Sequence, residues 1–211
     1  MPKLSVIYRA YPLVSKKTLV NFSDKTEMMK LCLRSLDNSL NHSDLDFDFT
    51  FISDNCSDEQ IDLVRSYFAN RRNMYKEILL SGSGNCETFR LQIENACSAQ
   101  SDFVLLLEDD YYISLSDIEV NIKALESCNL DYTTFFYPAD ADPTLGNMRC
   151  GNINLTKDIS AIELPTTTLT FFAKRETLIK DKNIFLTFSK GNHDSSLWLR
   201  LTGNFPSFLL K

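Results

Sequence analysis

The chain has 211 residues, of which 44% are hydrophobic and 24% are charged, and its formal net charge at pH 7 is -6. This length allows one sizeable hydrophobic core, and the composition is that of a folded protein rather than a disordered one. The negative charge argues against a nucleic-acid partner, because phosphate backbones are bound through clustered Lys and Arg. No amino-terminal signal peptide and no membrane span are predicted, so we expect a cytoplasmic protein.

The first half of the chain predicts alternating strands and helices. Apolar side chains that recur every three or four residues predict the helices, and Ser57 or Asp58 can cap the second of them. The expected strands cover residues 4–9, 47–53, 74–80 and 103–108, and the expected helices cover 24–40, 58–70 and 86–99. This alternation implies βαβ units and therefore an α/β fold with a mainly parallel central sheet.

The second half predicts a mixed arrangement. A helix is expected over 117–127, which Ser114 or Ser116 can cap, followed by short strands over 132–137 and 166–173 and a helix over 194–202. No linker rich in Gly, Pro or Ser interrupts the chain. We therefore expect one domain over 1–211, with a nucleotide-binding half over about 1–110 and an unlike half over about 111–211.

The six cysteines are scattered and include no Cys-x-x-Cys pair. An even number of cysteines is weak evidence for disulfides in a chain of this length, and reduced thiols in an intracellular protein are expected instead.

An apolar run over 103–107 ends in three consecutive acids, Glu108, Asp109 and Asp110. Five apolar residues in a row are typical of a strand covered on both faces, and open α/β sheets bind ligands at the carboxyl ends of their strands. Adjacent carboxylates raise one another's pKa unless a cation or hydrogen-bond donors compensate. Mg²⁺ or Mn²⁺ bridging to substrate phosphates would do so. A solvated strand-to-loop turn explains the triplet equally well.

Polar residues also follow the earlier predicted strands, and by the switch-point rule they would share one ligand. Asp54 and Asn55 offer an acceptor and a donor to the edge of a base, although they also suit a turn before a helix. The loop containing Gly82 and Gly84 is no P-loop and lacks the third glycine of the dinucleotide fingerprint, so a flexible turn is expected there. The first strand ends in Tyr8, Arg9 and Ala10.

A further segment, 193–201, begins with His193 and Asp194 before apolar residues at helical spacing. Taken alone, Asp194 is best explained as a helix cap. His193, beside this carboxylate, could complete the coordination of a metal, although a lone histidine is more often structural.

Together, these segments resemble the GT-A fold glycosyltransferases, and among them the large family-2-like group. Residues 5–11 parallel the opening strand that contacts the nucleotide base, and 52–59 look like the D-D-G-S-x-D-E segment, with Asp54 as the base-reading acid. Residues 107–110 look like the D-x-D motif in a Glu-Asp-Asp form, and 193–201 are similar to E-D-x-x-L-x-x-R-L, with His193 in place of Glu. Arg90 lies near the position of the family's Ala-Arg-Asn stretch but out of register. The chain also resembles the amino-terminal domain of a large chlorovirus glycosyltransferase.

The resemblance implies a Rossmann-like nucleotide-binding half and a mixed acceptor-side half. It also implies a metal-dependent, inverting transferase that moves a hexose or deoxyhexose, of glucose or rhamnose type, from a UDP-sugar to a glycan or glycoprotein hydroxyl. This would occur in viral glycan synthesis in the host cytoplasm, within a longer multidomain chain.

The resemblance also implies a role for each site residue. Asp110 would bind Mn²⁺ or Mg²⁺, His193 would bind the metal or the diphosphate, and Asp194 would be the general base. The remaining candidates would hold the nucleoside or orient the sugar, the ribose and the metal's waters: Tyr8, Arg9, Ala10, Asp54, Asn55, Arg90, Glu108 and Asp109. Asp140 and Asp142 could touch the sugar or acceptor, although a surface turn explains them better.

Two other functions share parts of this pattern. A sugar-1-phosphate nucleotidyltransferase should carry a Gly-rich, basic loop directly after the first strand, and residues 8–12 do not supply one. A catalytically silent domain that only binds the nucleotide sugar is the other alternative.

Overall fold

The computed structural model describes residues 2–13, 22, 24–70, 74–128, 130–135, 152–154, 160–162, 164, 167–190 and 193–203. Its centre is a six-stranded sheet with the strand order β3-β2-β1-β4-β8-β5. The strands of this sheet are β1 (Lys3–Ala10), β2 (Asp46–Asp54), β3 (Tyr75–Leu80), β4 (Phe103–Glu108), β5 (Tyr132–Thr133) and β8 (Phe171–Lys174). A separate antiparallel pair is formed by β6 (Asn152–Asn154) and β7 (Ser160–Ile162).

The first four strands of the sheet run parallel to one another, as the sequence predicts. At the edge beyond β4 the pattern changes, because β8 pairs antiparallel with both β4 and β5. The sheet is thus mainly parallel with a mixed edge, and the two halves of the chain meet where β4 lies beside β8.

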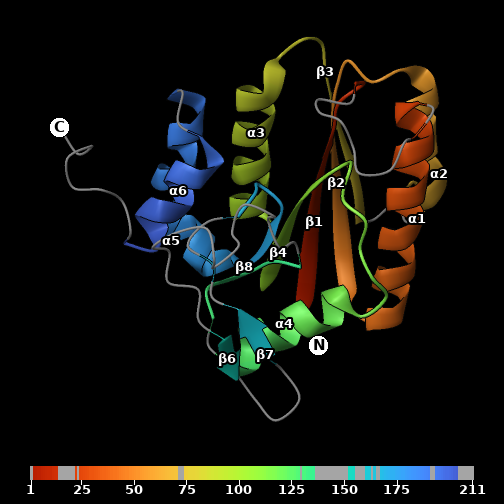
Figure 1. The fold of residues 1–211 in the computed structure, drawn as a ribbon. Coiled ribbons are helices and arrows are strands. Elements are labelled where there is room, and N and C mark those ends of the chain that lie inside the picture. The colour runs from red at the N-terminus through yellow and green to blue at the C-terminus, as the bar shows by residue number, and fades with distance from the viewer. Residues whose placement is uncertain are drawn as a thin grey trace.

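Helices cover both faces of the sheet, which gives three layers (Figure 1). One face packs against α1 (Lys25–Ser43), α2 (Asp58–Phe68) and α4 (Asp117–Ser127), and the other packs against α3 (Gly84–Ser98), α5 (Arg175–Phe185) and α6 (Asp194–Leu201). A 3-10 helix, η3 (Leu186–Lys190), joins the two last helices. Because both faces are covered, β1 is buried from Leu4 to Ala10 without alternation.

Most of the predicted elements are confirmed to within a few residues at each end. Ser57 caps α2 in a capping box, because its hydroxyl accepts the Gln60 N–H and the Gln60 side chain accepts the Ser57 N–H. Ser116 occupies the cap position of α4 but makes no side-chain cap hydrogen bond. Instead, the Asp117 carboxylate accepts the Ser114 N–H at 2.7 Å.

Three predictions in the second half are incomplete or lie outside the described residues. The strand predicted over 166–173 is observed as β8, which begins only at Phe171, and α5 follows it without having been predicted. Of the strand predicted over 132–137, only Tyr132–Thr133 is a strand (β5), residues 134 and 135 are not, and 136 and 137 lie outside the described residues. Asp140 and Asp142 lie outside the described residues.

The described cysteines are free, in agreement with the expectation of reduced thiols: Cys32, Cys56, Cys86, Cys97 and Cys128. Cys150 lies outside the described residues. Among the helices described, none combines the length and the apolar character that crossing a bilayer requires.

Candidate active site

The carboxyl ends of β1 and β4 form the switch point of the sheet. From β1 the chain proceeds outward to β2 and β3, and it then returns to the other side of β1 as β4. Crossovers that leave in opposite directions open a crevice beyond the strand ends, where sheets of this kind bind ligands. The strand register places Arg9 beside Glu108 at this point.

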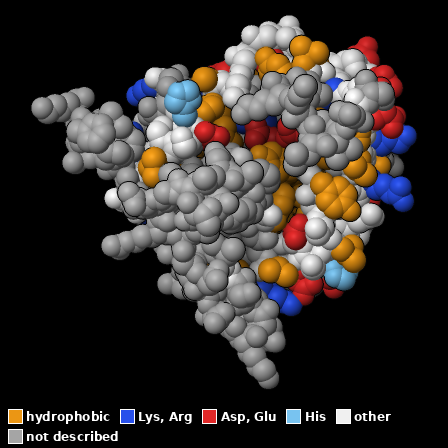
Figure 2. All heavy atoms as spheres, viewed as in Figure 1, with side chains coloured by type: hydrophobic (Ala, Val, Ile, Leu, Met, Phe, Trp, Pro, Cys, Tyr) orange, Lys and Arg blue, Asp and Glu red, His pale blue; other side chains and the backbone are white. Residues whose placement is uncertain are grey.

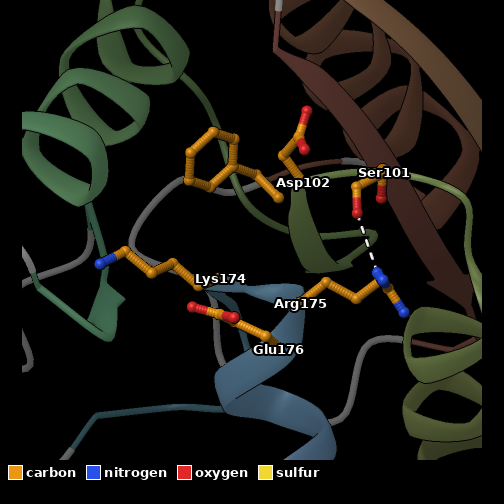
Figure 3. A pocket seen from close by; sticks show the side chains of 6 residues that line it. Ser101, Asp102, Lys174, Arg175 and Glu176 are labelled. Carbon is orange, nitrogen blue, oxygen red and sulfur yellow. Dashed lines mark hydrogen bonds between the residues drawn. The ribbon is translucent and has the colours of Figure 1, made fainter.

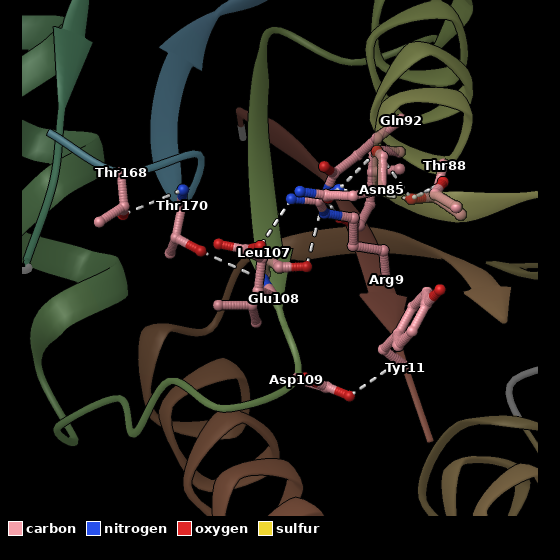
Figure 4. Close-up of polar contacts among 12 residues, drawn as sticks. Arg9, Tyr11, Asn85, Thr88, Gln92, Leu107, Glu108, Asp109, Thr168 and Thr170 are labelled. Atoms are coloured by element: carbon pink, nitrogen blue, oxygen red, sulfur yellow. Dashed lines mark hydrogen bonds and ion pairs between the residues drawn. The ribbon is translucent and has the colours of Figure 1, made fainter. Parts of the chain in front are cut away.

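Arg9 is held by groups on both sides of this crevice (Figure 4). Its guanidinium donates to the Glu108 carboxylate at 2.6 Å, to the Asn85 carbonyl at 3.2 Å and to the Thr88 hydroxyl at 3.4 Å. It also donates to the Asn85 side-chain oxygen and lies 5.4 Å from the centre of the Phe89 ring. Since Arg9 is only 5% exposed, it is a buried cation fixed between β1, β4 and α3.

The Glu108 carboxylate, whose side chain is 28% exposed, sits between this cation and other acids. Burial raises the pKa of Glu108, Arg9 lowers it, and the carboxylates of Asp110 and Asp194 raise it further. Asp194 is far from Glu108 in sequence, so the fold brings the start of α6 within electrostatic range of Glu108.

Asp109 points away from this group and has its own cation. One carboxylate oxygen accepts from the Lys25 ammonium at 2.7 Å, and the other accepts the Tyr11 N–H at 2.9 Å. The side chains of Asp109 and Lys25 are both 7% exposed. Burial raises the pKa of Asp109 to about 6 although Lys25 opposes the shift. Asp109 therefore ties the end of β4 to the start of α1 and to the residue that follows β1.

Asp110 differs from its two neighbours. Its side chain is exposed, and no hydrogen bond or ion pair joins it to another described residue. With Glu108 and the half-buried Asp194, it forms an acidic group whose charge is only partly compensated. Acidic side chains gather near the upper centre of the face shown in Figure 2, beside a histidine.

A divalent metal such as Mg²⁺ or Mn²⁺ needs several oxygen ligands. Within the described ranges, no group of three or more His, Cys, Asp or Glu side chains is arranged to hold a metal ion. Glu108 and Asp109 are poor candidates for ligands because each already carries an ion pair. The exposed carboxylate of Asp110 offers one ligand, which suits a cation that takes most of its ligands from water and a substrate diphosphate, as Mg²⁺ does.

Asp54 has a structural role that the sequence did not reveal. The side chain is completely buried, and its two carboxylate oxygens accept the N–H groups of Ser83 at 2.9 Å and Gly84 at 2.7 Å. Gly82 and Gly84 adopt φ values of 72° and 80°, which the glycines make possible. The amides at the start of α3 are therefore directed at Asp54. Contact between Asp54 and a base stays a prediction, because the carboxylate is completely buried.

The remaining predicted residues differ in how accessible they are. Tyr8 is 1% exposed, and its ring packs against Phe49 and Phe51 in the core, while Ala10 is 3% exposed. Asn55 is exposed beside the crevice, in the left-handed region at a φ of 61°. The structure thus leaves Asn55 open to a ligand and buries the side chain of Tyr8.

Arg90 lies on α3, and His193 directly precedes α6. Arg90 is held by ion pairs with Glu87 and Glu94 along α3. His193 is exposed and is the N-cap residue of α6, so Asp194 is the first residue of the helix rather than its cap. Since Asp194 is the first helical residue, the prediction of a capping role for it is wrong.

Several residues of the site were not predicted. Three polar side chains on one face of α3 point to the ends of β1 and β4: Asn85, Thr88 and Gln92. Gln92 donates to the carbonyls of Ile7 at 2.6 Å and Leu107 at 3.2 Å. The sequence signal that could have predicted this face is the spacing of the three polar residues, which recur after three and four positions along the helix. Nothing in the local sequence marks Lys25 as the partner of Asp109.

A cavity of about 250 Å³ lies at the opposite end of β4 (Figure 3). It is lined by Ser101, Asp102, Phe103, Lys174, Arg175 and Glu176. These residues include two acids and two bases, so the lining has no net formal charge. The acidic residues that the sequence singled out lie at the other end of the strand.

Comparison with solved structures identifies the architecture. S. aureus TarS 1–349 in complex with UDP-GlcNAc matches with a TM-score of 0.55 and 16% identity, over 93% of this chain and 52% of that chain. An active-site mutant of LgtC matches with a TM-score of 0.52 and 12% identity, over 96% of this chain and 70% of that chain. The chain has the GT-A fold.

At these identities the likeness concerns the fold. The GT-A domain described here spans about half the length of the TarS chains that it matches, with coverage of 49%, 52% and 54% in three structures of TarS 1–349. Neither a protein-family model nor a curated protein matches the sequence.

Proposed function

We propose that this protein is a glycosyltransferase that uses a nucleotide sugar and a divalent metal. One observation supports the proposal: the carboxylates of Asp110 and of Asp194, at the start of α6, both raise the pKa of Glu108 at the switch point of the sheet. Residues from the two halves of the chain would thereby form one acidic site, at the place where a sheet of this topology binds its ligand.

The proposed donor is a UDP-sugar, and the proposed metal is Mn²⁺ or Mg²⁺. The TarS structures with UDP-GlcNAc and with UDP support the choice of a uridine nucleotide, because they share this fold. The sequence resemblance supports a hexose or deoxyhexose donor of glucose or rhamnose type and a glycan or glycoprotein acceptor. It also supports viral glycan synthesis in the host cytoplasm, as one domain over 1–211 of a longer chain.

The metal would be held by Asp110, with His193 as a second candidate ligand. When bound, such a cation neutralises charge that builds up on the leaving diphosphate. The chain's own contribution would be to keep Asp110 free while Arg9 and Lys25 neutralise Glu108 and Asp109. This leaves one fully available carboxylate from the triplet, which suits an ion that is largely coordinated by substrate and water.

Asp194 would act as the general base. Its carboxylate takes the proton from an acceptor hydroxyl while that oxygen forms a bond to the anomeric carbon of the sugar. The bond from the anomeric carbon to the diphosphate oxygen breaks in the same step, and the configuration inverts. The half-buried position of Asp194 at the start of a helix keeps the carboxylate accessible to an acceptor.

Asn55 and the backbone around Arg9 and Ala10 would contact the nucleoside. Asn55 is exposed at the end of β2, next to the amides that Asp54 holds. The role of Arg9 would be to fix Glu108, which in turn would orient the ribose or the sugar. Tyr8 and Asp54 are buried and would support the residues that make these contacts. Arg90 is the least favoured of the candidate ligand-binding residues, because it forms ion pairs with Glu87 and Glu94 on α3.

A thermal-shift panel of nucleotide sugars with and without Mn²⁺ tests the proposal, because a ligand that binds the folded state raises its melting temperature. We expect the largest shift for one UDP-sugar together with Mn²⁺, and release of UDP when a glycan acceptor is added. Binding without any release of UDP, with or without acceptor, would favour a silent binding domain. Absence of a shift with every nucleotide sugar would contradict the proposal.

A further inference from the structure

The segment 167–170, which precedes β8, touches the end of β4 through Thr170. The Thr170 hydroxyl accepts the backbone N–H of Glu108 at 3.1 Å (Figure 4). Thr170 is completely buried, and its carbonyl also accepts from the Thr134 hydroxyl at 3.2 Å. A buried hydrogen bond of this kind fixes the backbone of the first acid of the triplet, because breaking it leaves a buried donor without a partner.

The same segment touches α6 through Thr168. The carbonyl of Thr168 accepts the indole N–H of Trp198 at 3.0 Å, and its hydroxyl accepts the Thr170 N–H at 3.3 Å. Thr168 also forms a side-chain hydrogen bond with Tyr111, whose pKa is raised well above its ordinary value by burial and by three carboxylates, against the effect of this hydrogen bond. Two threonines of one short segment therefore contact β4, the residue after the triplet and α6.

Trp198 is the anchor of α6. It lies one helical turn after Asp194, is 5% exposed, and packs edge-on against Phe171, Phe185 and Tyr132 at centroid distances of 4.9, 5.7 and 5.4 Å. The helix has only eight residues and no side-chain cap at His193. A helix this short is not stable by itself, so its position depends on packing contacts such as those of Trp198.

We propose that Thr168 and Thr170 are positioning residues that set the distance between Asp194 and the acidic triplet. The connection runs from Glu108 through Thr170 and Thr168 to Trp198, and one helical turn then leads to Asp194. This inference rests on the proposed function, because it assigns a purpose to the distance between a base and a donor site. Small displacements of a reacting group reduce turnover strongly while they leave binding of the donor unchanged.

The variant Trp198→Phe tests the connection, because it removes the indole N–H and keeps an aromatic ring in the cluster. Tyr132→Phe is the matched control: it lies in the same cluster and loses one side-chain hydrogen bond, from its hydroxyl to Asp181 at 2.7 Å on α5. For Trp198→Phe we expect kcat for sugar transfer to fall by about 10- to 100-fold, with the Kd for UDP within about twofold of wild type. For Tyr132→Phe we expect both constants to stay within about twofold.

A second pair of variants covers the case in which Trp198→Phe does not fold. Thr170→Ser keeps the hydroxyl that accepts from Glu108, whereas Thr170→Val removes it at nearly the same volume. We expect Thr170→Ser to retain most of kcat and Thr170→Val to lose about tenfold, again without a change in the Kd for UDP.

The failure of this inference can be told apart from the failure of the proposed function. If wild-type protein transfers sugar, and the folded variants at Trp198 and Thr170 transfer it at the wild-type rate, the positioning role is overturned and the function stands. Equal losses of kcat in Trp198→Phe and Tyr132→Phe would also overturn it, because the effect would then come from general destabilisation. A wild-type protein that transfers no sugar from any nucleotide sugar would overturn both.

Discussion

The two sides of the candidate site differ in how far their charges are compensated. On the side of β1 and β4, Glu108 forms an ion pair with Arg9, and Asp109 forms one with Lys25. Asp54 accepts hydrogen bonds from the amides of Ser83 and Gly84. On the side of α6, Asp194 is half-buried, and its carboxylate accepts only the N–H of the next residue, Ser195, among the hydrogen bonds described. The compensated acids build the scaffold. Asp110 is the exception on the first side, because it follows β4 but is exposed, and it and Asp194 are the two acids that we propose for metal binding and proton transfer.

The largest effect is expected on the uncompensated side, for Asp194→Asn. If Asp194 is the base, kcat for transfer should fall by roughly 10²- to 10⁴-fold, because an amide cannot take the acceptor's proton. Metal-dependent binding of UDP should persist, as measured by calorimetry. Asp181→Asn, on α5, is a control that should leave kcat near the wild-type value. Loss of UDP binding with unchanged turnover per bound donor would contradict the assignment.

On the compensated side, Lys25→Met should lower the free energy of unfolding by about 3–5 kcal/mol, because it leaves the buried Asp109 carboxylate without its cation. Urea denaturation at neutral pH measures this loss. Lys123→Met removes an exposed ion pair with Glu119 and should leave the free energy of unfolding nearly unchanged. Similar results for the two variants would mean that the buried pair does not stabilise the scaffold.

Asp54→Ala should destabilise the protein by about 2–3 kcal/mol, because two backbone donors at the start of α3 lose a charged acceptor. Asp54→Asn, which keeps one acceptor oxygen, should lie between wild type and the alanine variant in urea denaturation. The exposed Asp62, changed to alanine, is the control. If Asp54→Ala instead unfolds like wild type and loses only UDP affinity, Asp54 belongs with the ligand-binding acids.

The smallest effect on stability is expected for Asp110→Asn, which should change the free energy of unfolding by no more than about 0.5 kcal/mol, since the side chain is exposed. The same variant should lose the dependence of UDP binding on Mn²⁺, which titration calorimetry with and without the metal measures. If the affinity of the variant for UDP still depends on Mn²⁺, Asp110 is not a metal ligand. Asp110 and Asp109 would then no longer differ in the role proposed for them.

The elements of the first half were predictable because their signals are local. The apolar run before Glu108 needs no partner to predict a strand, and the capping box at Ser57 lies within four residues. The second half was harder to predict. The helix α5 begins with charged residues and keeps only a few buried positions, among them Leu178 and Phe185, so its pattern is weak.

The sequence by itself determined the chemistry that is available: three acids at the end of a buried strand, a carboxylate at the start of a Trp-containing helix, and an α/β order of elements. The local order of apolar and polar residues fixes these features. The tertiary structure alone decided which acids are neutralised and which stay open, because Arg9, Lys25 and the amides of α3 reach Glu108, Asp109 and Asp54 across long sequence separations. Ion pairing depends on distance in space, and local sequence patterns do not specify that distance.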